Sequence, residues 1–518
     1  MTANKKIFLN VIATYGRSLF ALACGLFTAR WVLQALGQED FGLYGVIGGL
    51  VVFISFFNSL LGTSLSRFYA VSVGAVGAAS DKDAAINECR GWFSSAIFVH
   101  SVVPLVLVLA GWPLGEKAIC DGWVAIPADR LNDCLWVFRF SCVSCFISMV
   151  TVPFNAMYIA KQRIAELTIY SFATTTLNCF FFYYISSTPG KWLVPYAEWI
   201  SAMSLLPAII ISIRALISFP ECRLIYAEML STPRMKALAS FAGWQAFGAF
   251  GSILRGQGIA ILLNRHVEFG SMRNSSMSVA NQLAGQADTF ASAMVGAFQP
   301  AIANAFGARD FDGMRSLAYR TCKFSTVLSG VFALPLALEI HEVLNLWLCE
   351  PPVFAATFCI GSLIAHLIDR LSVGHMLAVN AAGRVATYQA FLGTSLIMAI
   401  PVACIFMFLN LGVVSIPIAI VLTGSICSLG RVVFAQKLVG MSIRFWFVRI
   451  LFPISVVFAA ALVMGLVPRL YLAQSFTRVV VSSVVIESVL LCGTWLLVLD
   501  VNERSVVQTK LISWLRRP

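Results

Sequence analysis

The chain has 518 residues, of which 59% are hydrophobic and only 12% are charged, and its formal net charge is +12. A soluble protein carries roughly twice that share of charged residues, so these values exclude an ordinary soluble enzyme or binding module. Apolar runs of about 20 residues recur from end to end, and each is long enough to cross a bilayer as a helix. The sequence predicts an all-α polytopic membrane protein, because the runs lack the alternation of a membrane β-barrel.

The apolar runs predict about fourteen transmembrane helices. In chain order they cover residues 8–35, 41–64, 92–113, 133–158, 167–187, 192–216, 237–264, 275–304, 322–347, 353–378, 387–409, 411–434, 446–467 and 476–499. The connections between them are short, so none is expected to fold as a separate soluble domain.

The charge pattern predicts the orientation of the chain. Lys and Arg gather in alternate connections and at both ends, in stretches such as "NKK", "AKQR", "CRLIYAEMLSTPRMK" and "KLISWLRRP". Because basic loops stay on the cytoplasmic side, we expect both termini in the cytoplasm. Basic loops facing anionic lipid explain the net charge, and no nucleic-acid partner is required.

The order of the spans suggests two lobes. Residues 1–218 hold six spans, 219–236 form a basic cytoplasmic linker, 237–436 hold six more, and 437–518 hold two C-terminal helices and a basic tail. The second and eighth spans share a run from a glycine, Gly62 or Gly296, to a charged loop. An even number of spans in each lobe predicts a parallel repeat with its axis along the membrane normal.

The first helix of each lobe carries an arginine, Arg17 or Arg255. Arg17 lies about 15 Å from the cytoplasmic end of its span at 1.5 Å per residue. A charge at that depth costs several kcal/mol, so it is expected to face a cavity or a partner. The planar guanidinium binds phosphate oxygens in pairs, which suits a pyrophosphate in a cationic cavity between the lobes. The alternative is a structural ion pair with an acid on a neighbouring helix.

Other charged residues within the spans are weaker candidates. Arg30 lies near the outer end of the first span, where it could bind pyrophosphate or reach the lipid headgroups. Arg139 is a further pyrophosphate candidate and Glu198 an ion-coupling candidate, or the two pair with each other. Asp369 and Arg370 are neighbours and are expected on different sides of their helix, one toward the lumen and one toward the cytoplasmic edge.

The eighth span is the most polar one. It carries Asn281, Gln282, Gln286 and Asp288, and Gln257 lies on the span before it. Lipid cannot satisfy such groups, so they are expected to face water or substrate. The four amides suit a glycan, and Asp288 is a candidate site for a coupling proton or cation.

Cofactor chemistry has little support in the sequence. The histidines lack metal-ligand spacing, and no phosphate-binding loop marks an ATPase, so we expect no metal and no cofactor. Cys120 and Cys134 bracket the largest outer loop, and a disulfide between them in an oxidising periplasm is an open alternative.

Three functions remain open at this point. They are a transporter of an anionic sugar-bearing lipid, an exporter of small molecules or drugs, and a membrane glycosyltransferase or polymerase. The enzyme could use Glu39 and Asp40, but their loop is about five residues long and no large outer loop completes a pocket. Cationic drugs favour an acidic cavity, and the predicted cavity is basic, which favours the anionic lipid.

Two stretches carry a family resemblance. "ARWVLQALGQEDFGLYGVIGGLVVFISFFNSLLGTSLSRFYAVSVG" resembles the N-terminal signature of bacterial O-antigen and polysaccharide flippases, which belong to the multidrug/oligosaccharidyl-lipid/polysaccharide (MOP) exporter superfamily. "NSSMSVANQLAGQADTFASAMVGAFQPAIANAFGARDFDGMRSLAYR" is similar to the matching region of the second lobe. The fourteen spans and two lobes also fit such proteins over the whole length.

The resemblance implies a V-shaped, two-lobe, MATE-like transporter of the bacterial inner membrane that is not an enzyme. Its substrate would be an undecaprenyl-pyrophosphate-linked oligosaccharide, carried to the periplasmic leaflet by alternating access and driven by membrane potential, H⁺ or Na⁺. Membrane lipids and other polysaccharide-assembly proteins would be its partners. Family members line the cavity with basic residues, and Arg17, Arg30 and Arg255 match that pattern best. A lipid II flippase is a close alternative.

Overall fold

The structure is a computed structural model that describes residues 3–78, 80–121, 126–265, 270–348, 351–501, 503–505 and 508, some helical side chains excepted. In these ranges the chain forms helices and turns and no strands, which confirms the all-α prediction. It divides into two compact units. The N-terminal unit is Met1–Gly243 with Gln299–Asp310, and the C-terminal unit is Trp244–Phe298 with Phe311–Pro518.

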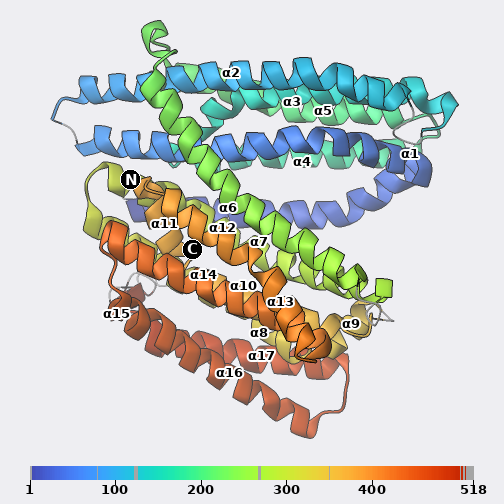
Figure 1. Cartoon of the computed structure of the whole chain (residues 1–518), viewed down its shortest axis with the longest axis vertical. Coiled ribbons are helices and arrows are strands. Elements are labelled where there is room, and N and C mark those ends of the chain that lie inside the picture. The colour runs from blue at the N-terminus through green and yellow to red at the C-terminus, as the bar shows by residue number, and fades with distance from the viewer. Residues whose placement is uncertain are drawn as a thin grey trace, which may run out of the picture. The chain divides into compact units, whose positions relative to one another are not determined.

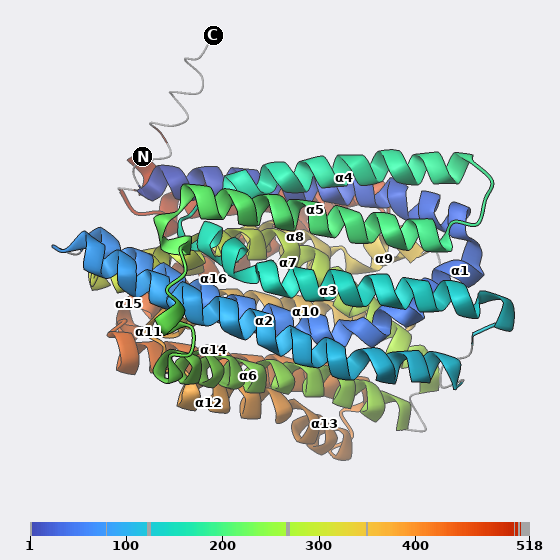
Figure 2. The ribbon, with the colours of Figure 1, turned by 90° about the horizontal axis from the view of Figure 1, so that it is seen from above.

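The N-terminal unit is a layered helix bundle (Figures 1 and 2). Its helix α3 packs against α1, α2 and α5, and α1 also packs against α2 and α4. The core between them is apolar, with Ile47, Val137 and Met149 fully buried. The helices are α1 (Ala3–Ala78), α2 (Lys82–Cys120), α3 (Leu131–Ala160), α4 (Ile164–Ser187), α5 (Leu193–Ser218), the first part of α6 (Thr232–Arg265) and the end of α7 (Gly270–Gly307).

Helix α1 contains the first two predicted spans, joined by a break at Gly37. That residue has φ 73° and ψ 174°, a backbone conformation that is accessible essentially only to glycine. The rest of α1 is helical, so the first two spans meet at a single bent residue rather than through a loop. The apolar runs predicted the spans, and Gly37 supplies the conformation that separates them.

The segment 219–236 is fastened to the N-terminal unit. It contains two short 3₁₀ turns, Pro220–Cys222 and Tyr226–Glu228, before α6 begins. Lys161 Nζ lies 2.5 Å from Glu221 Oε1, and the Glu221 side chain is almost inaccessible. The hydroxyl of Ser95 donates a hydrogen bond of 2.7 Å to the carbonyl of Glu228. These contacts hold the linker against the ends of α2 and α3.

The C-terminal unit contains the remaining helices. Helix α14 packs against α10, α11, α12 and α13, while α8 packs against α10, α11, α16 and α17. Figure 1 shows α16 and α17 running side by side. Beyond the rest of α6 and α7, the helices are α8 (Phe311–Leu338), α9 (Ile340–Leu348), α10 (Ala355–Arg370), α11 (Val373–Ala382), α12 (Ala386–Ile397), α13 (Ala399–Phe408), α14 (Ser415–Val439), α15 (Ile443–Trp446), α16 (Phe452–Tyr471) and α17 (Phe476–Gly493).

A buried ion cluster attaches the last two helices to α8. Glu339 follows α8 and its side chain is inaccessible. Arg469 Nε lies 3.1 Å from Glu339 Oε1, Arg478 Nη2 lies 2.9 Å from Oε2, and the hydroxyl of Ser482 also donates to the carboxylate. Two guanidinium groups and one hydroxyl thus compensate the buried charge of Glu339.

The predicted spans all fall on helices. Nine helices in the described ranges are long and apolar enough to cross a membrane, and α10 and α11, bent by 47° at their junction, form a tenth candidate. The other predicted spans fall on α1, which has many side chains outside the described part, on α4, and on the polar α7. The helices are those of a multi-pass membrane protein, as the composition predicted.

Candidate functional site

Arg17 lies in the first half of α1, about 20 Å along the helix from Ala3 at 1.5 Å per residue. The neighbouring Phe20 packs on Phe172 of α4 with ring centroids 4.9 Å apart, which fixes this turn of α1 against the bundle. The Arg17 side chain is half-buried, and no hydrogen-bond or ion-pair partner occurs for it among the described residues. Its positive charge is therefore not neutralised by any acidic side chain described in this unit.

Arg255 is the corresponding cation of the C-terminal unit. It lies on α6 on the same face as Gly248, Gly251 and Gly258, because residues spaced by three and four share a helix face. A Cβ atom at Gly251 would lie 2.7 Å from the Cα atom of Gly393 on α12, so the glycines let the two helices approach closely. Arg255 is therefore held on the face that α6 packs into its own unit.

No ion pair or hydrogen bond to Arg255 occurs among the residues that the structure describes. The carboxylate whose charge reaches it belongs to Asp369. That carboxylate already has two cationic partners, since Arg431 Nη1 lies 2.6 Å from Oδ1 and Arg370 Nη2 lies 3.3 Å from Oδ2. Among the described residues, the structural ion pair that would explain Arg255 without a ligand is therefore not present.

A second acid completes a charge cluster in the C-terminal unit. Asp288 of α7 lies 2.7 Å from Arg370 Nη2 and 3.4 Å from His366 Nδ1, and Ser292 donates a hydrogen bond to it. The chain of contacts thus alternates in sign from Asp288 through Arg370 and Asp369 to Arg431. Among the described residues two acids balance two arginines, so Arg255 is a surplus positive charge in that set.

The prediction for Asp369 and Arg370 was wrong. We expected these neighbours on different sides of their helix, but their side chains pair at 3.3 Å. Both residues lie in the last turn of α10, and the long Arg370 side chain reaches back to the neighbouring carboxylate. Both the Asp288 and the Asp369 side chains are 37% accessible, so the acidic members of the cluster reach the surface of the unit.

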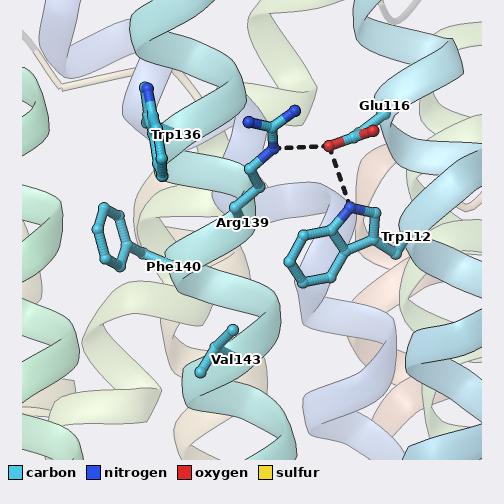
Figure 3. Close-up of a pocket in the computed structure, with 6 residues that line it drawn as sticks. All are labelled: Trp112, Glu116, Trp136, Arg139, Phe140 and Val143. Atoms are coloured by element: carbon cyan, nitrogen blue, oxygen red, sulfur yellow. Dashed lines mark hydrogen bonds and ion pairs between the residues drawn. The ribbon is translucent and has the colours of Figure 1, made fainter.

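Arg139 is paired, but with a different residue from the one expected. Its Nε lies 2.7 Å from Glu116 Oε1 on α2, and its guanidinium lies 5.4 Å from the ring centroid of Trp136 (Figure 3). The alternative in which Arg139 pairs with Glu198 is wrong. Glu198 is exposed on α5 and has no partner among the described residues. Trp112 stands four residues before Glu116, and this helical spacing is the one sequence signal for Glu116. In the structure the Trp112 indole donates a hydrogen bond to the Glu116 carboxylate.

Several predicted site residues remain untested. The side chains of Arg30, Gln257, Gln282 and Gln286 lie outside the described part of the chain. Asn281 is exposed on α7, where a glycan or water could reach its amide. The assignments of these residues to substrate, and of Asp288 and Glu198 to a coupling ion, stay predictions.

The structure also bears on the enzyme and disulfide alternatives. Asp40 is buried and lies 3.3 Å from Arg130, so it is tied to a basic partner rather than presented to a substrate. Cys120 and Cys134 are both free thiols here, one exposed and one buried. No group of three or more metal-ligating side chains occurs in the described part of the chain.

The fold has solved relatives, although the chain matches no protein-family model and no curated protein sequence. An outward-facing multidrug resistance MATE family transporter of the MOP superfamily aligns with 13% identity over 85% of this chain and 96% of its own, at a TM-score of 0.65. A mutant MATE transporter of Vibrio cholerae aligns with 13% identity over 86% and 98%, at 0.66. A MOP superfamily transporter of Pyrococcus furiosus, described as having a binding pocket of reverse polarity, aligns with 13% identity over 85% and 96%, at 0.65.

These likenesses extend over most of both chains, so the chain has the fold of the solved MATE transporters. At such low identity the likeness concerns the fold, and a fold by itself does not assign a substrate. The nature of the substrate has to be argued from the charged side chains of each unit.

Proposed function

We propose that the chain is a flippase that moves an undecaprenyl-pyrophosphate-linked oligosaccharide from the cytoplasmic to the periplasmic leaflet. The observation that carries the proposal is that Arg17 and Arg255, within membrane helices of different units, have no ion-pair partner among the described residues. A guanidinium that is not neutralised by protein is costly in a membrane, so an anionic ligand is its natural partner.

The chemistry of the pyrophosphate matches these arginines. A pyrophosphate carries several negative oxygens, and a guanidinium donates to two of them at once. Neutralising that charge removes much of the cost of bringing the headgroup across hydrocarbon. The polyprenyl tail is apolar and stays in the bilayer. Glycan hydroxyls would then meet amides such as those of Gln257 and Asn281, with Gln282 and Gln286 as further donors and acceptors.

A MATE-like exporter of cationic compounds is the second candidate. The accessible carboxylates of Asp288 and Asp369 favour it, since acidic groups attract cations. Against it, Arg370 already pairs with both acids and Arg431 pairs with Asp369. The Pyrococcus furiosus transporter is described as having a binding pocket of reverse polarity, so this fold is not limited to one pocket polarity. A lipid II flippase shares the anionic chemistry and remains a close alternative.

A coupling ion for the transport cycle belongs to the same proposal. Asp288, beside His366 and Arg370, is our candidate for a coupling H⁺ or Na⁺, with Glu198 as a weaker one.

We also propose that the protein lies in the bacterial inner membrane with both termini cytoplasmic, as the distribution of Lys and Arg predicts. Reporter fusions at each terminus test the orientation.

The experiment for the function is complementation of a bacterial strain that lacks its own O-antigen flippase. Arg17→Gln and Arg255→Gln should each abolish surface polysaccharide while membrane levels of the protein stay normal. Arg384→Gln is the matched control, because Arg384 is exposed in the connection between α11 and α12. Full activity of both test variants would contradict the proposal. A sugar-transfer product made by the purified protein would favour the enzyme alternative instead.

A further inference from the structure

A pocket of about 480 Å³ lies between α2 and α3, and neither Arg17 nor Arg255 lines it (Figure 3). On its α2 side the pocket is lined by Trp112 and Glu116. These two residues continue a stripe that begins with Leu105 and Leu109, and the successive spacings are four, three and four residues. Such spacing keeps all four side chains on one face of the helix. The polar end of this face lies toward the end of α2 and its apolar part lies deeper in the span.

The α3 side of the pocket is formed by Trp136, Arg139, Phe140 and Val143. Trp136 and Val143 are 45% and 43% exposed, and Leu109 on α2 is 66% exposed. In a helix that crosses a membrane, exposed apolar side chains of this kind face lipid acyl chains. The pocket therefore opens from the N-terminal unit toward the bilayer.

The depth of the pocket matches the headgroup region. Glu116 stands one turn before α2 ends at Cys120, about 6 Å from that end, and Arg139 stands about 12 Å from the start of α3. Two tryptophans, Trp112 and Trp136, border the charged pair, and indoles gather at the membrane interface. The predicted orientation assigns this end of the helices to the periplasmic leaflet.

The ion pair leaves polar groups of Arg139 and Glu116 without a partner in the part of the chain that the structure describes. Arg139 bonds to Glu116 through Nε, and no bond from its Nη groups occurs among the described residues. Glu116 Oε1 accepts from both Arg139 Nε and the Trp112 indole, whereas no donor to Oε2 is described. The pocket thus offers open N–H donors beside an open carboxylate oxygen, at the surface of the unit and next to apolar side chains.

We propose that this pocket binds a zwitterionic phospholipid with a primary ammonium headgroup, such as phosphatidylethanolamine. The lipid phosphate accepts from the Nη groups of Arg139, and the ammonium donates to Glu116 Oε2. One acyl chain lies along Leu109 and Leu105. Because Arg139 and Glu116 balance each other, a zwitterion fits the pocket better than a headgroup with net negative charge. A choline headgroup has no N–H to donate, so it binds less well.

Native mass spectrometry of the purified full chain tests this assignment. Phosphatidylethanolamine, phosphatidylcholine and phosphatidylglycerol with identical acyl chains are added in turn, and bound lipid is counted. We expect the ethanolamine lipid to bind about fivefold more tightly than the other two. A ratio of about five is the gain in affinity expected from one half-exposed charged contact. Glu116→Gln should remove this preference, and Arg139→Gln should weaken all three lipids, while Arg139→Lys retains most of the binding.

The matched control is Arg214→Gln, which removes another ion pair of the same unit with a similar N–O distance. Arg214 Nη2 lies 2.8 Å from Glu166 Oε1, and neither residue lines the pocket. Equal binding of the three lipids by the wild-type protein would overturn the proposal. So would an equal loss in Arg214→Gln and Arg139→Gln. The site is independent of the flippase proposal, because lipid preference is measured without transport.

Discussion

Arg431 Nη1 lies 2.6 Å from Asp369 Oδ1 within the C-terminal unit, and Arg370 Nη2 lies 3.3 Å from the other oxygen of the same carboxylate. Asp369 is also the acid whose charge reaches Arg255. Because two closer guanidinium groups already share this carboxylate, it cannot fully neutralise a third. The surplus charge on Arg255 is a consequence of this arrangement, and it is the basis for expecting an anionic ligand there.

The Asp369–Arg431 pair predicts strong energetic coupling. Asp369→Asn leaves Arg431, whose side chain is only 12% accessible, without its acid, and Arg431→Gln leaves Asp369 with Arg370 alone. Removing one partner of such a pair typically costs about 3 kcal/mol. Each single variant should lower the Tm of the purified protein, and the double variant should lower it by less than the sum. Additive losses would show that the two side chains do not act together.

The Glu339 cluster predicts a stabilising attachment of α16 and α17. Glu339→Gln leaves Arg469 and Arg478 without their buried carboxylate, which should destabilise the protein by about 3 kcal/mol and lower its Tm by several degrees. Thermal unfolding in detergent measures this change. Glu487→Gln on α17 is a suitable control, since no partner of Glu487 occurs among the described residues and its Tm should stay close to the wild-type value.

The glycine face of α6 predicts a sharp contrast between two substitutions in one helix. A Cβ at Gly251 would lie 2.7 Å from the backbone of Gly393, whereas a Cβ at Gly256 meets nothing within 4 Å. Gly251→Ala should therefore force α6 and α12 apart and lower the Tm. Gly256→Ala should leave the Tm unchanged or raise it, because alanine is favoured over glycine in a helix by about 1 kcal/mol. Thermal unfolding of both variants checks the contrast, and equal losses would contradict the close approach.

The sequence was sufficient to predict where the helices lie. Apolar runs of bilayer length reveal a span through composition alone, and the predicted spans fall on helices from α1 to α17. The breaks were harder to foresee. Gly37 bends α1 through a backbone conformation that no apolar pattern encodes. Glu339 stands at the break between α8 and α9, and its partners lie on α16 and α17.

The partners of the intramembrane charges could not be predicted from the sequence. Arg139 pairs with Glu116 and Arg370 with Asp288, and in both cases the acid stands on another helix. Spacing along one helix reports which side chains share a face, but it does not report which face a neighbouring helix presents. Arg17 and Arg255 could be selected from the sequence because a charge inside an apolar run is unusual whatever its surroundings.

Binding of undecaprenyl pyrophosphate to the purified protein tests the central claim most directly. The affinity is measured in nanodiscs for the wild type, Arg17→Gln, Arg255→Gln and the control Arg384→Gln, with undecaprenol as the uncharged probe. We predict that the wild type and the control bind the pyrophosphate more tightly than undecaprenol. In each test variant the ratio of the two affinities should fall about tenfold or more, because one charge-assisted pair with the pyrophosphate is lost. Equal affinity of the wild type for the pyrophosphate and for undecaprenol would contradict the claim.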